Sequence, residues 1–154
     1  MVPSAIASLG IEENILPACR ELGIGITAYG VLSRGLLSGH WSKDRRLAAG
    51  DFRTVSPRFS DGNLALVDAL RTLAEAKGVT VAQLAIAWVL AKGEDIVPLI
   101  GARRRERLAE ALGALDVTLS RADLDAIEAA IPPGAAAGTR YAHQQLAHLD
   151  SESR

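Results

Sequence analysis

Residues 96–107 read IVPLIGARRRER, an apolar run followed by a small-residue turn and a cluster of arginines. The run Ile96 to Ile100 is short and apolar, which predicts a buried parallel strand. Pro98 removes one ladder hydrogen bond, so this strand is expected to be distorted or to lie at an edge. A helix is predicted to follow over Arg103 to Ala114. A strand, a tight turn and a helix in this order favour an α/β fold.

Upstream, the segment Ile24 to Tyr29 (IGITAY) predicts a second buried parallel strand. A short helix over Glu12 to Leu22 precedes this strand, and Gly23 ends the helix. Proline is tolerated only near a first helical turn, so Pro17 indicates a start later than Glu12. After the strand, Gly30 and Gly35 bracket a loop, and residues 36–60 are expected to be irregular.

Two helices are predicted between the strands. Asn63 is expected to cap the first, Leu64 to Lys77, which Gly78 ends and which has Leu66, Leu70 and Leu73 on one face. Thr80 and Gln83 form a capping box for the second, which ends at Lys92.

A last helix, Leu124 to Ile131, follows a cap made by Ser120 and Asp123. The order is helix, strand, helix pair, strand, helix pair, which implies parallel pairing. Two or three strands cannot make a sheet covered on both faces, so part of such a sheet is expected to be missing.

The composition describes a globular chain of 154 residues, 49% apolar and 23% charged, with a net charge of −1. This balance gives no global attraction to nucleic acid or anionic membranes. The single cysteine, Cys19, excludes an internal disulfide and a cysteine-based zinc site. The longest apolar run, Val81 to Ala91, is too short to span a bilayer, and we expect a cytoplasmic protein. The three histidines lack metal-ligand spacing, and no metal site is predicted.

The arginines after residue 102 predict an anion site. Cations at a helix N-terminus oppose the helix dipole, and a phosphate would remove that cost by meeting both the guanidinium groups and the free backbone N–H groups. The alternative is a solvated basic face on which Glu106 and Glu110 pair with the arginines.

A second candidate is the segment YGVLSRG, residues 29–35, at the carboxyl end of the first strand, where parallel α/β folds bind ligands. Tyr29 could stack on a flat ring, and the glycines would permit close backbone approach. The alternative is a core tyrosine followed by a simple turn.

Two long segments resemble the bacterial aldo/keto reductases: CRELGIGITAYGVLSRGLLSG (Cys19 to Gly39) and the stretch from VAQLAIAWVL to GTRY (Val81 to Tyr141). The segment PRFSDGNLALVDAL (Pro57 to Leu70) also fits, with several family residues lacking. The resemblance implies the C-terminal portion of a (β/α)₈ TIM barrel, with two to three parallel strands and five to six helices. Residues 1–154 are then one domain, with a weakly ordered lead at 1–10 and a tail at 134–154.

In that family the barrel binds NADP(H), and hydride passes to an aldehyde or ketone. By position, Tyr29 matches the residue stacked on nicotinamide, Arg107 the arginine on the 2′-phosphate and adenine, and Glu110 the adenine-contacting acid. The implied cofactor-binding set is Tyr29, Gly30, Leu32, Ser33, Gly35, Gly101, Ala102, Arg103, Arg104, Arg107 and Glu110. This sequence departs from the family pattern where Ala102 replaces Ser or Thr, Ala111 replaces Asn, and Gly30–Val31 replaces Ser-Pro.

The family's catalytic Asp, Tyr, Lys and His lie on the first four strands, upstream of the matching region. About ten residues precede the match, and Tyr141 does not match the catalytic tyrosine, so no catalytic residue is expected here. Cofactor binding without turnover is therefore expected of the isolated chain, with association or homo-oligomers formed through exposed barrel edges. The alternatives are a non-catalytic nucleotide-binding or oligomerising half-barrel, a subunit completed by another polypeptide, or a truncated remnant.

Overall fold

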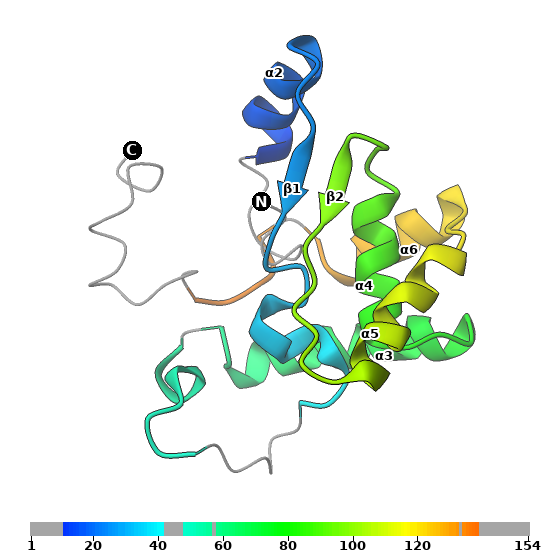
Figure 1. Cartoon of the computed structure of the whole chain (residues 1–154). Helices are drawn as coiled ribbons and strands as arrows, with labels where there is room; N and C mark the ends of the chain where they lie inside the picture. Colours follow the sequence, from blue (N-terminus) through cyan, green and yellow to red (C-terminus); the bar gives the residue numbers. More distant parts are fainter. Residues whose placement is uncertain (1–10, 42–47, 57, 133, 139–154) are drawn as a thin grey trace.

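The computed structural model describes residues 11–41, 48–56, 58–132 and 134–138 (Figure 1). The elements in chain order are the π-helical turn η1 (Ile11–Ile15), α2 (Leu16–Glu21), β1 (Ile26–Ala28), the 3-10 segments η2 (Ser33–Ser38) and η3 (Phe52–Val55), α3 (Asp61–Ala76), α4 (Val81–Leu90), β2 (Ile96–Pro98), α5 (Arg105–Leu112), the 3-10 turn η4 (Gly113–Asp116) and α6 (Arg121–Ala130). The lead 1–10, the tail from 139 with Tyr141, His143 and His148, and residues 42–47, 57 and 133 lie outside the described residues.

The two predicted strands exist and pair in parallel, with Ile26 opposite Ile96 and Ala28 opposite Pro98. Each is shorter than predicted. Pro98 is the last residue of β2, and the next N–H, that of Leu99, donates to the carbonyl oxygen of Ala28 at 2.8 Å. Proline is therefore accommodated at the end of the ladder, where its missing donor costs least.

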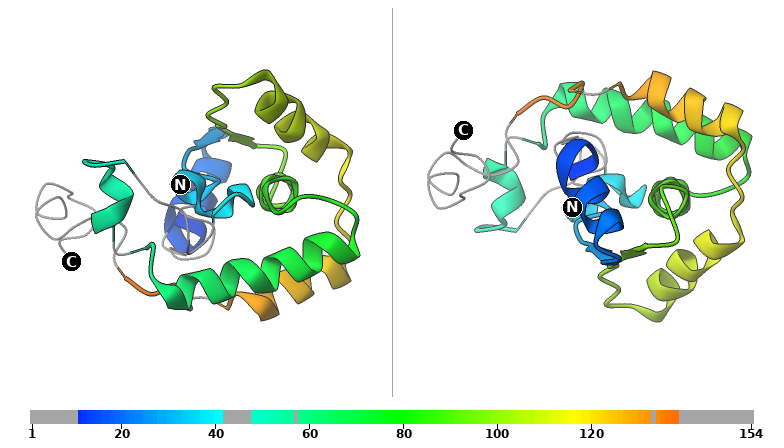
Figure 2. Two further views of the ribbon diagram at one scale, coloured as in Figure 1. Left: turned by 90° about the horizontal axis from the view of Figure 1, so that it is seen from below. Right: turned by 90° about the horizontal axis from the view of Figure 1, so that it is seen from above.

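The sheet is covered on one face. Ala28 and Ile96 are buried, whereas Thr27 and Val97 point to the other face and are exposed, as the two-residue period of a strand requires. Figure 2 shows α4 end-on behind the strands, with α3 and α6 forming a further layer beyond it. Most side chains of α4 are buried, so this helix is the centre of the core.

Helix starts follow the local prediction at two places. Thr80 with Gln83, and Ser120 with Asp123, form capping boxes in which each side chain bonds the other residue's backbone N–H. These boxes satisfy backbone donors that the first helical turn leaves free.

The predicted cap at Asn63 is wrong. The helix α3 begins at Asp61, with Ser60 at the N-cap position, and Asn63 lies inside the first turn. Its side chain is 3% exposed and bonds the backbone of a distant segment, accepting from the N–H of Ala137 at 2.8 Å and donating to its carbonyl at 2.9 Å. A tertiary contact therefore uses the amide that a local cap would have used.

The buried face of α3 is rotated slightly about the helix axis from the predicted face. It passes through Leu64, Val67, Leu70 and Ala74, whereas Leu66 and Leu73 are half-buried. The expected late start of the first helix is wrong, because the π-helical η1 begins at Ile11 and runs directly into α2, with Pro17 in the first turn of α2. Cys19 is partly exposed.

The helix predicted from Arg103 is shorter at both ends. Arg104 has extended backbone angles (φ −118°, ψ 145°) and stands at the N-cap of α5, so Arg103 and Arg104 lie in the turn before the helix. The segment expected to be irregular, residues 36–60, contains the end of η2, which is kinked at Arg34 and Gly35, and the short 3-10 turn η3. Such short turns have no sequence period that would predict them.

Among the described residues, no single helix is long and apolar enough to cross a membrane. One pair passes that test by length and composition, α3 with α4, and the two are bent by 87°.

Candidate functional site

A pocket of about 620 Å³ opens at the carboxyl ends of β1 and β2. Its volume is in the range of small-molecule sites, which is roughly 300–1,000 Å³. The wall is built from the loop after β1, the loop after β2, η3, and the adjoining parts of α4 and α5. The lining residues are Gly30, Val31, Leu32, Arg34, Gly35, Ser38, His40, Arg53, Ala82, Ile86, Leu99, Ile100, Gly101, Arg103, Arg104, Arg107, Glu110 and Ala111.

Two segments predicted separately from the sequence meet in this pocket. Of the eleven predicted cofactor-binding residues, eight line it: Gly30, Leu32, Gly35, Gly101, Arg103, Arg104, Arg107 and Glu110. Tyr29, Ser33 and Ala102 are not among its lining residues, although each adjoins one in sequence. Tyr29 is 45% exposed, so the alternative of a core tyrosine is wrong. The parallel pairing of β1 and β2 is what brings the two loops to one edge.

The loop after β1 has an uncommon backbone. Ser33 and Arg34 have positive φ values of 46° and 56°, and Gly35 follows at 97°. Left-handed conformations cost non-glycine residues roughly 1–3 kcal/mol each and gather at ligand clamps. The loop is held by the Gly35 N–H, which donates to the carbonyl of Leu32 at 2.8 Å, and by the hydroxyl of Ser38, which donates to the carbonyl of Gly35 at 2.6 Å. These two hydrogen bonds hold the turn of this loop at the pocket wall.

The arginines differ in their partners. Arg107 forms an ion pair with Glu110 at 2.8 Å and also contacts the Nε2 atom of His40. Arg103 and Arg104 form no ion pair within the described part of the chain, although both line the pocket. The alternative of a self-neutralised basic face thus describes Arg107 and Glu110 but not the two arginines of the turn.

Sequence reasoning missed Arg53, which lines the pocket from η3. Its Nε donates to Asp51 at 2.8 Å and its Nη2 to the other carboxylate oxygen of the same residue. These hydrogen bonds raise the pKa of Arg53 above its ordinary value, which keeps the side chain charged. The only sequence signal was an aspartate two residues before an arginine in a segment without periodicity.

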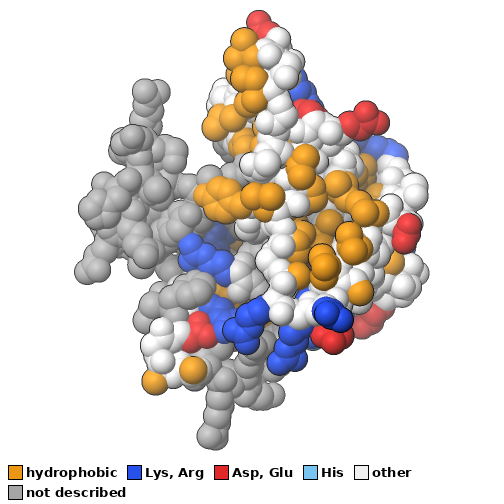
Figure 3. All heavy atoms as spheres, viewed as in Figure 1, with side chains coloured by type: hydrophobic (Ala, Val, Ile, Leu, Met, Phe, Trp, Pro, Cys, Tyr) orange, Lys and Arg blue, Asp and Glu red, His pale blue; other side chains and the backbone are white. Residues whose placement is uncertain are grey.

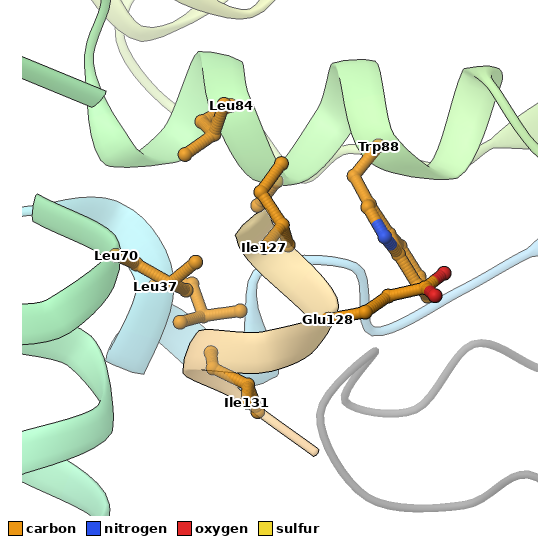
Figure 4. Close-up of a pocket in the computed structure, with 8 residues that line it drawn as sticks. Leu37, Leu70, Leu84, Trp88, Ile127, Glu128 and Ile131 are labelled. Carbon is orange, nitrogen blue, oxygen red and sulfur yellow. The ribbon is translucent and has the colours of Figure 1, made fainter. Parts of the chain in front are cut away.

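A second cavity lies in the core between α4, α6 and η2, away from the predicted residues (Figure 4). Its volume is about 40 Å³, and Leu37, Ile127 and Ile131 make much of its wall. Glu128 stands at the cavity beside the indole of Trp88, whose Nε1 has no acceptor among the described residues. A space this small holds a water molecule or two and cannot accept a nucleotide.

No cluster of three or more His, Cys, Asp or Glu side chains that could hold a metal ion occurs within the described ranges.

The family model described as "Aldo/keto reductase family" matches residues 6–132. Probable aldo-keto reductase 1 of Glycine max is 42% identical over 135 residues, which are 85% of this chain and 39% of that protein. Aldo-keto reductase yakc [NADP(+)] of Schizosaccharomyces pombe is 39% identical over 134 residues, with 84% and 39% covered.

A solved structure with the same fold is that of the glycerol dehydrogenase AKR11B4 from Gluconobacter oxydans. It superposes with a TM-score of 0.71 at 31% identity and covers 78% of this chain and 38% of that one. The chain therefore spans about two fifths of the length of the relatives it matches, and its two parallel strands with their helices are part of a (β/α)₈ barrel. Since the family match extends over most of its residues, the chain belongs to the aldo/keto reductase family.

Proposed function

We propose that this chain binds NADP(H) in the pocket at the ends of β1 and β2, as the cofactor-binding part of a carbonyl oxidoreductase. The observation that carries the proposal is the convergence of Arg103, Arg104 and Arg107 on that pocket, the first two without an ion pair among the described residues. The oxygens of a phosphate group accept paired hydrogen bonds from the guanidinium group of an arginine. One relative has NADP(+) in its name, which supports the same cofactor.

The residues present fit a phosphorylated dinucleotide. Gly30 and Gly101 have no heavy atom within 4 Å of the point where a Cβ would lie, so the pocket wall leaves room for backbone approach on both loops. In our proposal Arg103, Arg104 and Arg107 hold the 2′-phosphate, and Glu110 orients Arg107 through their 2.8 Å ion pair. Tyr29, exposed at the end of β1, stacks on the nicotinamide. The bound cofactor would supply the hydride.

We also propose that the isolated chain binds cofactor without turnover. The acid, lysine and tyrosine that handle the proton in this family have no match among its residues, so the nicotinamide would meet no proton donor here. Joined to the remaining strands of the barrel, the same pocket would serve reduction of an aldehyde or a ketone.

The test of binding is an NADPH titration followed by calorimetry, with the variants Arg107→Ala and Arg121→Ala. Arg107→Ala should weaken NADPH binding by roughly tenfold or more, because a charge-assisted hydrogen bond is worth about 1.5–3 kcal/mol. Arg121 pairs with Asp125 on α6, outside the pocket, and its loss should leave the affinity unchanged. Equal affinities for all three proteins would contradict the proposed site.

Turnover is tested separately by mixing the chain, NADPH and a panel of aldehydes and ketones. We expect no carbonyl-dependent loss of NADPH absorbance above the protein-free rate. Steady oxidation that disappears in Arg107→Ala would overturn the proposal that this chain binds without turnover.

A further inference from the structure

Arg53 stands in the same pocket as the arginines around α5 but comes from a different element, η3. A nucleotide cofactor phosphorylated on its adenosine ribose carries two separate anionic groups, the 2′-phosphate and the pyrophosphate. In the proposed function Arg103, Arg104 and Arg107 bind the first of these, the 2′-phosphate. The second needs donors elsewhere in the pocket.

The guanidinium of Arg53 is held on two sides. The Asp51 carboxylate accepts from Nε at 2.8 Å and from Nη2, and it also accepts from the backbone N–H of Arg53 at 3.1 Å. The indole ring of Trp41 lies with its centroid 5.8 Å from the guanidinium carbon, and Phe59 packs edge-on against Trp41 with 4.6 Å between ring centroids. An arginine fixed in this way loses little freedom when it binds a ligand.

These contacts use two of the three guanidinium nitrogens and leave Nη1. That atom has no hydrogen-bond acceptor among the described residues, and it lies 3.9 Å from the point where a Cβ on Gly35 would be. Gly35 belongs to the loop with consecutive positive φ values, which also lines the pocket. The unoccupied Nη1 edge of this oriented cation therefore lies beside Gly35 at the pocket wall.

We propose that Arg53 is a second anion-binding residue, whose Nη1 donates to the pyrophosphate of the dinucleotide beside Gly35, with Asp51 as the residue that positions it. This inference rests on the proposed function, because it assigns the second anionic group of the same ligand. Asp51 offsets much of the net charge of Arg53, so the contribution comes from a directed N–H donor rather than from long-range attraction. An arginine side chain stays protonated in proteins, so this donor does not depend on pH.

The experiment measures the affinities of three ligands for three proteins by calorimetry. The ligands are NADPH, NADH, which lacks the 2′-phosphate, and 2′-AMP, which lacks the pyrophosphate. The proteins are the unmodified chain, Arg53→Ala and Arg107→Ala. Arg53→Ala should lower the affinities for NADPH and NADH by a similar factor, roughly tenfold, and leave the affinity for 2′-AMP unchanged. Arg107→Ala should lower the affinities for NADPH and 2′-AMP by a larger factor than the affinity for NADH, which has the adenine but no 2′-phosphate.

The crossed pattern separates binding from support of the fold. If Arg53 only held η3 in place, the Arg53→Ala substitution would lower the affinities for all three ligands or for none of them. Either outcome would overturn the inference. Asp51→Asn keeps the arginine but weakens its fork, so it should reproduce the Arg53→Ala pattern with a smaller factor. Should Arg53→Ala fail to fold, Arg53→Lys provides the same comparison, with both dinucleotides weakened and 2′-AMP spared.

The two proposals fail differently. If the unmodified chain binds none of the three ligands, the proposed function is wrong and the inference falls with it. If Arg107→Ala loses NADPH and 2′-AMP while Arg53→Ala binds NADH as tightly as before, the proposed function stands and the role of Arg53 is wrong.

Discussion

At the scale of single residues, Asn63 shows how one buried amide joins distant segments. Its nitrogen donates to the carbonyls of Arg58 and Ala137, and its oxygen accepts from the Ala137 N–H. The sequence indicates only that an asparagine stands near a helix start, where capping is its commonest role. The partner lies 74 residues away, so no local pattern could reveal it.

Asn63→Ala is expected to destabilise the chain by about 1–3 kcal/mol, because it removes the hydrogen bonds that the buried amide makes with the backbone of Arg58 and Ala137. Urea unfolding followed by far-UV circular dichroism measures the change. Thr72→Ala is the control on the same helix, since Thr72 is exposed and bonds only the carbonyl of Asp68. Similar unfolding midpoints for the two variants would show that the Ala137 contact adds nothing.

At the scale of elements, both capping boxes and both strands were predictable because their signals lie within a few residues. The lengths of the strands were not predictable, because the hydrogen-bonded ladder of one strand ends where the partner strand ends. Gln83 adds a contact that its capping box does not reveal: its Nε2 donates to the carbonyl of Glu110 at 3.1 Å, which ties the start of α4 to α5.

Gln83→Glu separates these two roles. Glutamate can still accept from the Thr80 N–H and complete the capping box, but it cannot donate to Glu110. We expect Gln83→Glu to lower the unfolding free energy by roughly 1 kcal/mol and Gln83→Ala to lower it further. Denaturant unfolding of the two variants tests this, and equal losses would mean that one of the two roles is energetically silent.

A pH dependence is expected where α3 meets α6. Hydrogen bonds from Lys77 and then Ser120 lower the pKa of Asp123 from 3.8 to about 2. A carboxyl group with a depressed folded pKa stabilises the fold above its unfolded pKa, and this contribution is lost as the pH falls through the folded value. The loss should therefore occur between about pH 4 and pH 2.

Unfolding free energies measured from pH 5 to pH 2 check this expectation. Asp123→Asn should flatten that part of the profile, whereas Asp125→Asn, which removes an exposed ion pair with Arg121, should leave its shape unchanged. If the Asp123→Asn profile falls as steeply as that of the unmodified chain, the ion pair with Lys77 is not the cause.

At the scale of the whole molecule, the apolar surface on the uncovered face of the sheet is the main consequence of a partial barrel. Figure 3 shows apolar side chains over the strands and the helices beside β2, with basic side chains below them. In β2, Val97 is 56% exposed, and on the α5–η4 segment Leu112 is 55% and Leu115 67% exposed. Exposed apolar surface and open strand edges favour association, and we propose that the isolated chain self-associates through this face.

Sedimentation velocity over a range of concentrations tests that association. The double substitution Val97→Thr with Leu112→Lys should shift the chain toward a slower-sedimenting species, because it places polar groups on the face. Leu22→Lys, at an exposed leucine after α2, is the matched control and should leave the distribution unchanged. An unmodified chain that sediments as a monomer at every concentration would rule the association out.

The candidate site belongs to this scale too. The sequence predicted two of its walls, because the strand ends and the misplaced arginines are local signals, and the parallel pairing then brings them together. It could not predict the third wall, because η3 reaches the pocket through an irregular segment that only the tertiary fold positions.

The central claim is that this pocket recognises a 2′-phosphorylated dinucleotide, and its most direct test is the affinity of the unmodified chain for NADPH relative to NADH at one salt concentration. The arginines at α5 predict that NADPH binds more tightly by at least roughly tenfold. Equal affinities for the two cofactors, or binding of neither, would contradict the claim.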